Sequence, residues 1–393
     1  MQLIKYGGAV TGIAEEKAII KSIKKSRKTR NWQTGAEAKK MEKELSDYLG
    51  VKHSVLTTSG SCAGLLALEA LELPKGSEVI ISAVTFPTIY NIILQCGLKP
   101  VVVDASVGTY NFTLEGVKEA INANTSAVIA VHALGNVADL VGLKSLTKSL
   151  GIKLILDNCD GLGTTLKGKK VESYADVAFT SFHAAHIVSM GVGGGVFTND
   201  SSLAKNVQMY RDWGRQADIN ESKNTKWSML PEDYNPRFIY EKIGYNFQIL
   251  ELQAAMGRVQ LKKIERIKKL RKKNFDFLYK NLKDYPLILP QWLPEADVCW
   301  FAFPLSVKGD RGSLLRFLEK RGIETRPMFS GNILAHPAYF KVFNVMKYPS
   351  ATVILRQSFW ISCHPSLTKK QLNYIVKTFH DFFTPNNSSS VNK

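Results

Sequence analysis

The sequence predicts an α/β protein with a mostly parallel sheet, helices on both faces of that sheet, and a smaller C-terminal α+β domain. Short apolar runs rich in Val, Ile and Leu alternate with helical patterns over roughly residues 35–257. Such runs, without polar alternation, are typical of parallel strands buried on both faces. Beyond a basic helical segment the pattern changes to WFAFPLSV, one helix, short strands and a closing helix.

The domains follow from this change of pattern. We expect an N-terminal arm with a helix over 1–34, a large domain over 35–260, a small domain over 261–385 and a disordered polar tail over 386–393.

The elements of the large domain follow in order. SVLTTSG reads as a strand that ends in a glycine turn, and a helix starts directly after it at SCAGLLALEAL. EVIISAVTF is the next strand, and TIYNIILQCG continues as a helix. The same rhythm predicts strands at KPVVVDAS, SAVIAVHALG, IKLILDNCD and DVAFTS, with helices over 114–122 and 140–150. In the small domain, SLLRFLEKRG and residues 369–383 read as helices.

Composition excludes several classes of protein. Hydrophobic residues make up 45% and charged residues 22%, as in proteins with an ordinary globular core. The first thirty residues contain AIIKSIKKSRKTR, which no signal peptide resembles, and no run approaches the ~18 apolar residues of a membrane span. The five cysteines are scattered and odd in number, which argues against a disulfide framework. We expect a cytoplasmic protein without a membrane partner.

The charge is strongly basic. Fifty-two Lys+Arg against 34 Asp+Glu give a net charge of +18, which suggests nucleic acid, anionic lipid or a phosphorylated small molecule as partner. The densest basic blocks are 21–30 and 262–273. Apolar residues at every third position over 261–270 predict an amphipathic helix with a solvated basic face. No aromatic residues are interleaved and no zinc-finger spacing occurs, so we expect no nucleic acid partner.

Four strand ends carry chemically useful residues, and ligands gather at such ends in open α/β sheets. The residues are Gly60, Ser61 and Cys62 at a helix start; Phe86; Asp157; and Ser181 with His186. A helix N-terminus favours phosphate, and a carboxylate favours a cationic ring. Singly, Ser61 reads as a helix cap, Phe86 as core and Asp157 as a turn residue. Together they describe a bound aromatic phosphate ester.

The stretch TSFHAAHIVSMGVGGGVFTND allows three interpretations. His183 and His186 lie three residues apart, but no carboxylate or thiol follows at a familiar metal-ligand spacing, so we expect no metal. A mononucleotide P-loop requires GxxxxGK[ST], and GVGGGVF lacks both the lysine and the hydroxyl. A surface loop shaped by its glycines is the third.

A family resemblance adds a further interpretation. TSGS, TFPT, LDNCD, SFHAAH, GVGGGVFTND and IGYNFQILELQAA follow one another over at least 35–340 and resemble the nucleotide-sugar aminotransferases. Those are pyridoxal-phosphate enzymes of fold type I, so the resemblance implies an aspartate-aminotransferase-like large domain. In that family the serine matching Ser181 contacts the cofactor phosphate, and a lysine five residues later holds the cofactor covalently. His186 stands at the lysine position.

A subgroup of the family shares this histidine, namely sugar 3-dehydratases that act on nucleotide-linked 4-keto-6-deoxyhexoses, as in lipopolysaccharide pathways. AHxxxMGxGG, DWGR, GYN, LQAA and TRxxFxGN also match it. An imidazole has no primary amine and cannot form the covalent bond to the cofactor. The resemblance therefore implies pyridoxamine or pyridoxal phosphate bound non-covalently. With an unperturbed pKa near ~6.5, His186 would be the base for the C4′ proton of the cofactor, whose loss expels the C3 hydroxyl of the sugar.

The resemblance also assigns further residues. Asp157 would hold the pyridine nitrogen, Asp160 the ring hydroxyl, and Phe86 would stack on the ring. Asn246 would reach the phosphate in the other subunit of a homodimer. The small domain supplies three substrate candidates: Arg326, Phe329 and Asn332.

One departure concerns iron–sulfur chemistry. Iron–sulfur members of the subgroup carry cysteines just after WGR, where this chain reads WGRQADINESKN, and Cys159 stands alone. A [2Fe–2S] cluster usually takes four thiolates, so we expect no cluster. A route in which L-glutamate regenerates the amine is then favoured. Val192 also replaces the usual glutamate of the glycine cluster.

The functional expectation is a cluster-free 3-dehydratase of a nucleotide-diphosphate sugar. The alternatives are a half-transaminase on a similar substrate, a non-enzymatic regulator that binds nucleic acid, and a structural subunit on the same fold. The sequence leaves open the nucleotide, the sugar stereochemistry and the need for a reductase partner.

Overall fold

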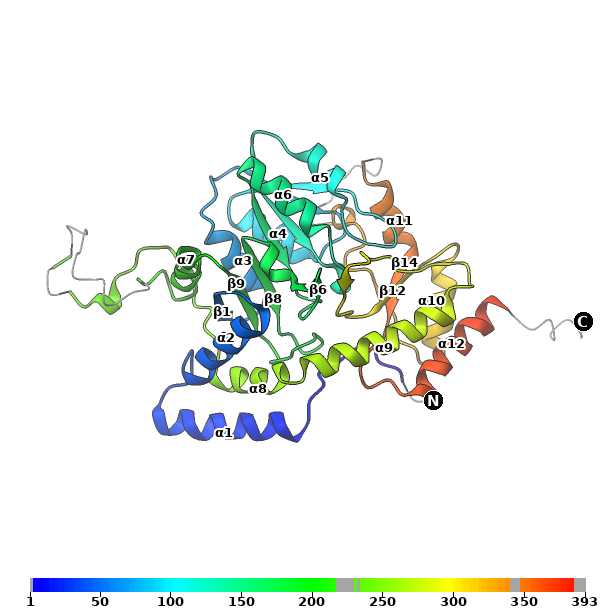
Figure 1. Cartoon of the computed structure of the whole chain (residues 1–393), viewed down its shortest axis with the longest axis horizontal. Helices are drawn as coiled ribbons and strands as arrows, with labels where there is room; N and C mark the ends of the chain where they lie inside the picture. The colour runs from blue at the N-terminus through cyan, green and yellow to red at the C-terminus, as the bar shows by residue number, and fades with distance from the viewer. Residues whose placement is uncertain (1–2, 217–229, 232–233, 340–346, 385–393) are drawn as a thin grey trace, which may run out of the picture.

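The central element of the described chain is a seven-stranded sheet in the order β1-β9-β8-β5-β4-β2-β3. The computed structural model describes residues 3–216, 230–231, 234–339 and 347–384, and the expected disordered tail lies outside them (Figure 1). The strands are β1 (His53–Thr57), β2 (Glu78–Ser82), β3 (Lys99–Val103), β4 (Thr125–Val131), β5 (Lys153–Asp157), β8 (Val177–Ser181) and β9 (Gly194–Thr198). Only β9 runs against its neighbours β1 and β8, so the predicted mostly parallel sheet is confirmed.

Both faces of this sheet are buried, because successive side chains of each strand enter different cores. In β4, Val128 and Ala130 join one hydrophobic cluster, while Ala127 and Ile129 join the other. Three helices cover the first face: α2 (Ala36–Leu49), α5 (Leu114–Ala120) and α6 (Leu140–Leu150). Three cover the second: α3 (Gly60–Glu69), α4 (Pro87–Gln95) and α7 (Ser201–Arg211). This two-sided burial explains why the strands read as continuous apolar runs.

A second sheet is antiparallel, with the order β10-β12-β14-β13 in the described part of the chain. Its strands are β10 (Leu287–Ile288), β12 (Phe303–Val307), β13 (Arg326–Pro327) and β14 (Ser358–Ile361). The helices of this region are α10 (Arg311–Lys320), α11 (Pro349–Gln357) and α12 (Lys369–Phe383). The N-terminal arm also joins it, because Ile4 bridges Ile323. A small three-stranded sheet comprises β6 (Thr165–Leu166), β7 (Lys169–Lys170) and β11 (Ala296–Asp297).

The observed elements differ from the predicted ones by a few residues at their ends. The strand expected over 78–86 ends at Ser82, and the helix after it begins at Pro87. Proline is favoured in the first helical turn because its missing N–H has no helical partner there. The helix expected from Ser61 begins at Gly60, since Ser59 caps it.

The amphipathic helix expected from residue 261 is confirmed over 264–273, but its start and its basic face differ from the expectation. The chain forms α8 (Glu251–Leu261) and then α9 (Ile264–Leu282), with a break between them. The basic face of α9 is also not wholly solvated, because Lys268 and Arg271 are buried. Lys268 pairs with Asp297 at 2.7 Å. The guanidinium of Arg271 donates to the Phe301 carbonyl and lies 5.6 Å from the centre of the Phe301 ring.

Helix α1 (Ile13–Thr29) lies outside the sheet layers and packs along α8 (Figure 1). Across the described residues, each helix is either too short or too polar to cross a bilayer.

Candidate cofactor site

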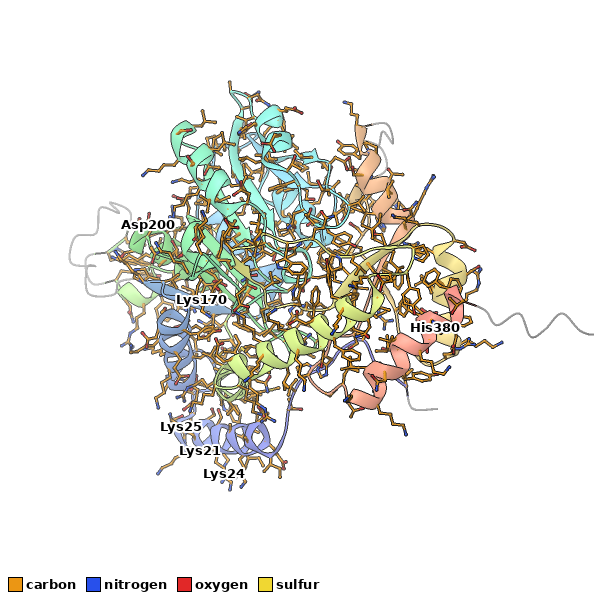
Figure 2. All side chains as sticks on the ribbon, turned by 45° about the vertical axis from the view of Figure 1, so that its right-hand side comes forward. Lys21, Lys24, Lys25, Lys170, Asp200 and His380 are labelled. Atoms are coloured by element: carbon orange, nitrogen blue, oxygen red, sulfur yellow. The ribbon has the colours of Figure 1, made fainter. Side chains whose placement is uncertain are left out.

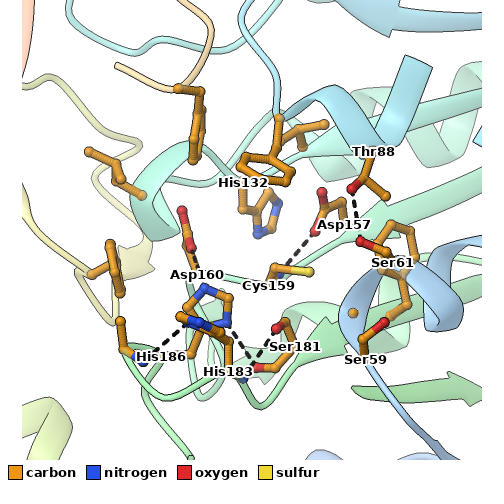
Figure 3. Close-up of a pocket in the computed structure, with 18 of the residues that line it drawn as sticks. Ser59, Ser61, Thr88, His132, Asp157, Cys159, Asp160, Ser181, His183 and His186 are labelled. Atoms are coloured by element: carbon orange, nitrogen blue, oxygen red, sulfur yellow. Dashed lines mark hydrogen bonds and ion pairs between the residues drawn. The ribbon is translucent and has the colours of Figure 1, made fainter. Parts of the chain in front are cut away.

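A cavity of about 390 Å³ opens where β5 and β8 end and α3 begins (Figure 3). The predicted residues on its wall are Gly60, Ser61, Phe86, Asp157, Asp160, Ser181, His186 and Phe329. The structure therefore brings together residues from all four predicted strand ends. It adds side chains from the N-terminal arm and from the small domain, among them Tyr6, Phe301 and Trp360.

The first turn of α3 forms one end of the cavity. Ser61 Oγ lies 2.9 Å from the hydroxyl of Thr88, and Gly60 passes directly beside Ser181. A Cβ at Gly60 would lie 2.5 Å from the Ser181 Cβ, so only glycine fits this approach. Exposed hydroxyls and N–H groups at a helix start suit a phosphate.

Cys62 differs from its two neighbours in this turn. Its backbone N–H already donates to Ser59 Oγ at 3.1 Å, and its side chain is not part of the described cavity wall. The expectation that Cys62 contributes to a phosphate cup is therefore not supported by this geometry.

Asp157 ends β5 at the back of the cavity. Its Oδ1 accepts from the Cys159 N–H at 3.0 Å, and only 6% of the residue is exposed. Burial raises the pKa of this carboxyl to about 6. A cationic partner in the cavity would stabilise the ionised form, as a protonated ring nitrogen does.

His186 and Asp160 form a pair beside Asp157. His186 Nδ1 lies 3.2 Å from the Ser181 carbonyl, which can only accept, so Nδ1 carries the hydrogen. The bare Nε2 then faces Asp160 Oδ1 at 3.5 Å. Burial lowers the pKa of His186 to about 4, whereas burial and the Asp157 charge raise the pKa of Asp160 to about 8. Both groups are therefore neutral near pH 7, and the unperturbed value of ~6.5 does not hold for His186.

His132 was missed from the sequence. It directly follows β4, lies on the cavity wall, and is 1% exposed. Neither ring nitrogen has a hydrogen-bond partner in the described structure, and burial lowers its pKa to about 3. The rule that singled out Asp157, a polar residue at the end of a buried strand, would also have found His132.

Aromatic side chains form the part of the cavity wall next to His186. Phe301 lies edge-on to His186 with ring centres 5.6 Å apart, and Trp360 lies 5.5 Å from both Phe301 and Tyr6. Phe86 is 56% exposed, so it is not a core residue. No local sequence pattern points to Tyr6, Phe301 or Trp360, because each comes from a segment far along the chain from the strand ends.

The remaining predicted residues lie elsewhere. Arg326 is exposed and lies 4.2 Å from the Tyr6 ring centre, beside the cavity wall rather than in it. Asn332 is fully buried, its Oδ1 accepts from the Leu334 N–H at 3.1 Å, and it does not line the cavity; its contact with substrate stays a prediction. Asn246 is exposed, bridges Asp212, and does not line the cavity of its own chain.

The glycine cluster and the first histidine of the loop also border the cavity. Val192 lies on the wall, and its carbonyl accepts from Gln253 Nε2 at 2.7 Å. His183 Nδ1 accepts from the Ala185 N–H at 3.3 Å. Within the described ranges, no three His, Cys, Asp or Glu residues are grouped as a metal site.

A pyridoxal-type cofactor fits these residues. The α3 start suits its phosphate and Asp157 suits its ring nitrogen. Asp160 Oδ2 is buried without a partner, as a group that awaits a ring hydroxyl would be. His186 Nε2 lies 3.5 Å from Asp160 Oδ1, and the imidazole offers no amine for covalent attachment.

Comparisons with known proteins agree with this geometry. The sequence model described as the DegT/DnrJ/EryC1/StrS aminotransferase family matches residues 14–380. The lipopolysaccharide biosynthesis protein RfbH of Salmonella typhimurium is 36% identical over 374 residues, with 89% of this chain and 86% of that protein covered. The dTDP-4-dehydro-2,6-dideoxy-D-glucose 3-dehydratase of Saccharopolyspora spinosa is 34% identical, with 88% and 80% covered. A solved GDP-4-keto-6-deoxymannose-3-dehydratase with a trapped PLP-glutamate geminal diamine superimposes with a TM-score of 0.85, 27% identity, and 95% and 99% coverage.

Proposed function

Because the chain belongs to the DegT/DnrJ/EryC1/StrS aminotransferase family, we propose that it is a 3-dehydratase of a nucleotide-linked 4-keto-6-deoxyhexose. Its cofactor is pyridoxamine or pyridoxal phosphate, held without a covalent bond. The proposal rests on His186. Its Nε2 carries no proton and faces Asp160, and its ring lies edge-on to Phe301 of the aromatic wall. The relative at 34% identity is named a nucleotide-sugar 3-dehydratase, and the relative at 36% identity is named a lipopolysaccharide biosynthesis protein.

The binding groups follow from the cavity. Gly60, Ser61 and Ser181 would hold the phosphate, Asp157 the ring nitrogen, and Phe86 a face of the ring. When bound, the cofactor would supply a conjugated ring system that delocalises the electron pair freed when its C4′ proton is removed. The exposed Asn246 would complete the phosphate site of a partner subunit in a homodimer.

The proton chemistry belongs to His186 and Asp160. Nε2 of His186 carries a free lone pair, so it can take a proton without first losing one. Asp160 beside it is protonated near pH 7 and can donate. Two neighbouring groups with pKa values pushed in opposite directions provide a base and an acid in one site, as deprotonation at the cofactor and departure of a hydroxyl require.

The aromatic wall would receive the sugar. Tyr6, Phe301 and Trp360 exclude water from the side of the cavity that faces His186. A deoxyhexose presents an apolar methyl group that suits such a wall. The net charge of +18 would attract the diphosphate of the substrate. Glutamate is the amine donor in this proposal, and the reaction proceeds without an iron–sulfur cluster.

The test uses purified protein loaded with pyridoxamine phosphate and supplied in turn with CDP-, GDP-, dTDP- and UDP-linked 4-keto-6-deoxyhexoses. Mass spectrometry and NMR should show a product that has lost the C3 hydroxyl with at least one of them. An amino sugar that retains this hydroxyl would instead identify a transaminase. Turnover without any C3 loss across the series rejects the proposal.

A further inference from the structure

Helix α1 buries mainly polar side chains and leaves three isoleucines exposed among charged residues. Glu15, Ser22 and Ser26 face α8 and are buried. Ile13 and Ile20, at 69% and 44% exposure, lie seven residues apart on the outward side, together with Ile23 at 40%. A surface helix normally has the reverse arrangement.

The inward side does not need the isoleucines to stay in place. Glu15 accepts from Gln260 Nε2 at 2.7 Å and also pairs with Lys263. Its other oxygen accepts from the Gly12 N–H at 2.9 Å at the start of the helix. Polar contacts thus hold α1 against α8, while Ile13, Ile20 and Ile23 stay 40–69% exposed.

A basic groove of about 820 Å³ adjoins the same helix. Lys21, Lys24 and Lys25 of α1 lie close together at its edge (Figure 2). Lys25 and Arg258 pair with Glu37. The other cations on the wall form no ion pair among the described residues: Lys21, Lys24, Lys28, Lys40 and Lys262. We term the groove and the three exposed isoleucines of α1 together the α1 surface.

Three occupants can be compared. A soluble polyanion such as nucleic acid would use the lysines but leaves the isoleucines without a role, and no aromatic side chain is interleaved with them. A second copy of the chain docked about a twofold axis would bury the isoleucines, but it would bring like charges together. An anionic bilayer satisfies both sets of side chains.

We propose that the α1 surface rests on an anionic phospholipid membrane, with Ile13, Ile20 and Ile23 at the headgroup–acyl boundary and the lysines against lipid phosphates. The expectation of no membrane partner rested on the lack of a spanning segment, and surface association needs none. The proposal is independent of the chemistry in the cavity.

The experiment measures co-sedimentation of the full chain with vesicles of phosphatidylcholine alone or with about a third phosphatidylglycerol. We expect binding to the anionic vesicles only, weakened by raised salt. The triple variant Ile13→Ser, Ile20→Ser, Ile23→Ser and the double variant Lys21→Glu, Lys24→Glu should each lower partitioning about tenfold or more.

Matched controls come from the opposite end of the molecule, at α5 and α6 (Figure 1). Val141 and Leu150 are 40% and 52% exposed, and Lys118 and Lys148 are exposed lysines. Val141→Ser with Leu150→Ser, and Lys118→Glu with Lys148→Glu, should leave binding unchanged. Circular dichroism would verify that each variant is folded, and salt titration of the wild type tests the charge dependence without any variant.

Several outcomes would overturn the proposal. They are equal binding to neutral vesicles, no binding to anionic vesicles, or equal losses in the control variants. A change in molar mass of the triple serine variant by light scattering would assign the surface to a second copy. Tight binding of single-stranded RNA that ignores the isoleucines and outcompetes the vesicles would assign it to nucleic acid.

Discussion

Two regions of the molecule bury acidic side chains, and the two differ in how many hydrogen-bond donors face the carboxyl group. In the seam between α1, α2 and α8, Glu251 is 4% exposed and accepts from the N–H groups of Gly35, Glu37 and Ala38 at 2.8–3.0 Å. In the cavity, Asp160 is 6% exposed, yet its Oδ2 has no partner in the described structure.

The difference separates stability from chemistry. A buried carboxylate with three donors at the start of a helix is satisfied and holds two helices together. A buried carboxyl with one oxygen left without a partner costs free energy in the empty protein and is poised for a ligand. The predictions below test this contrast, from the largest expected effect to the smallest.

Replacing His186 should show the largest effect. His186→Asn should reduce dehydration by about 10²–10⁴-fold, because the base is lost while the cavity keeps its shape. Urea unfolding should change little. His53→Asn serves as control, because His53 is half-buried at the start of β1 and does not line the cavity.

His186→Lys adds a second readout. With pyridoxal phosphate it should form a covalent lysine adduct, detectable by mass after borohydride reduction. A His186→Asn enzyme with wild-type turnover would contradict the assignment of the base.

Glu251→Ala should show the largest loss of stability. Three N–H groups at the start of α2 would lose their acceptor, which costs about 2–4 kcal/mol in urea unfolding. Glu251→Gln retains one acceptor oxygen and should cost less. The affinity of the folded fraction for the cofactor should stay the same. A loss of that affinity without a loss of stability would contradict the assignment of Glu251 to stability alone.

Gly60→Ala probes where the cavity depends on close packing. The added Cβ would lie 2.5 Å from Ser181 Cβ, so we expect a loss of about 1–3 kcal/mol and weaker cofactor binding. Gly12→Ala is the matched control, because a Cβ there meets no atom within 4 Å. Fluorescence titration with pyridoxamine phosphate measures the affinity. Equal affinity in both variants would contradict the phosphate assignment.

Asp160→Asn should show the smallest effect on stability, and the size of this effect depends on pH. The folded state holds a proton on Asp160 up to about pH 8, whereas the unfolded carboxyl releases it near its ordinary pKa of 3.8. Raising the pH from 4 to 8 therefore weakens the wild type, and the neutral amide of the variant escapes this loss.

The cofactor-free variant should gain a few degrees in Tm over the wild type at pH 8 and less at pH 5. Asp47→Asn, at an exposed carboxyl, should show no such pH dependence. A Tm difference that is the same at both pH values would contradict the raised pKa.

The sequence predicted the parts of the structure that have a local cause. Continuous apolar strands identified the sheet, and the strand-end rule led to Gly60, Asp157, Ser181 and His186, which line one cavity. It could not reveal the aromatic wall, because Tyr6, Phe301 and Trp360 meet only through the pairing of distant segments.

Local sequence patterns also misled where a polar residue that such a pattern places in solvent or at a substrate is in fact buried. Arg271 lies in a lysine-rich helix, yet it is 1% exposed because the Phe301 carbonyl and ring accept it. Asn332 matched a substrate motif, yet it caps the turn that follows it. Spacing alone does not distinguish these positions from solvated ones.

The reversed strand β9 has a consequence for protein engineering. Ser181 pairs with Gly194, so the segment 182–193 that carries His186 leaves and re-enters the sheet between two adjacent strands. Phe182 N–H donates to the Gly193 carbonyl at 2.8 Å and closes the segment at its base. The segment is thus a self-contained cassette with fixed ends. Grafting 182–193 from a lysine-bearing relative would exchange the reactive side chain while the sheet and the phosphate end of the cavity stay as they are.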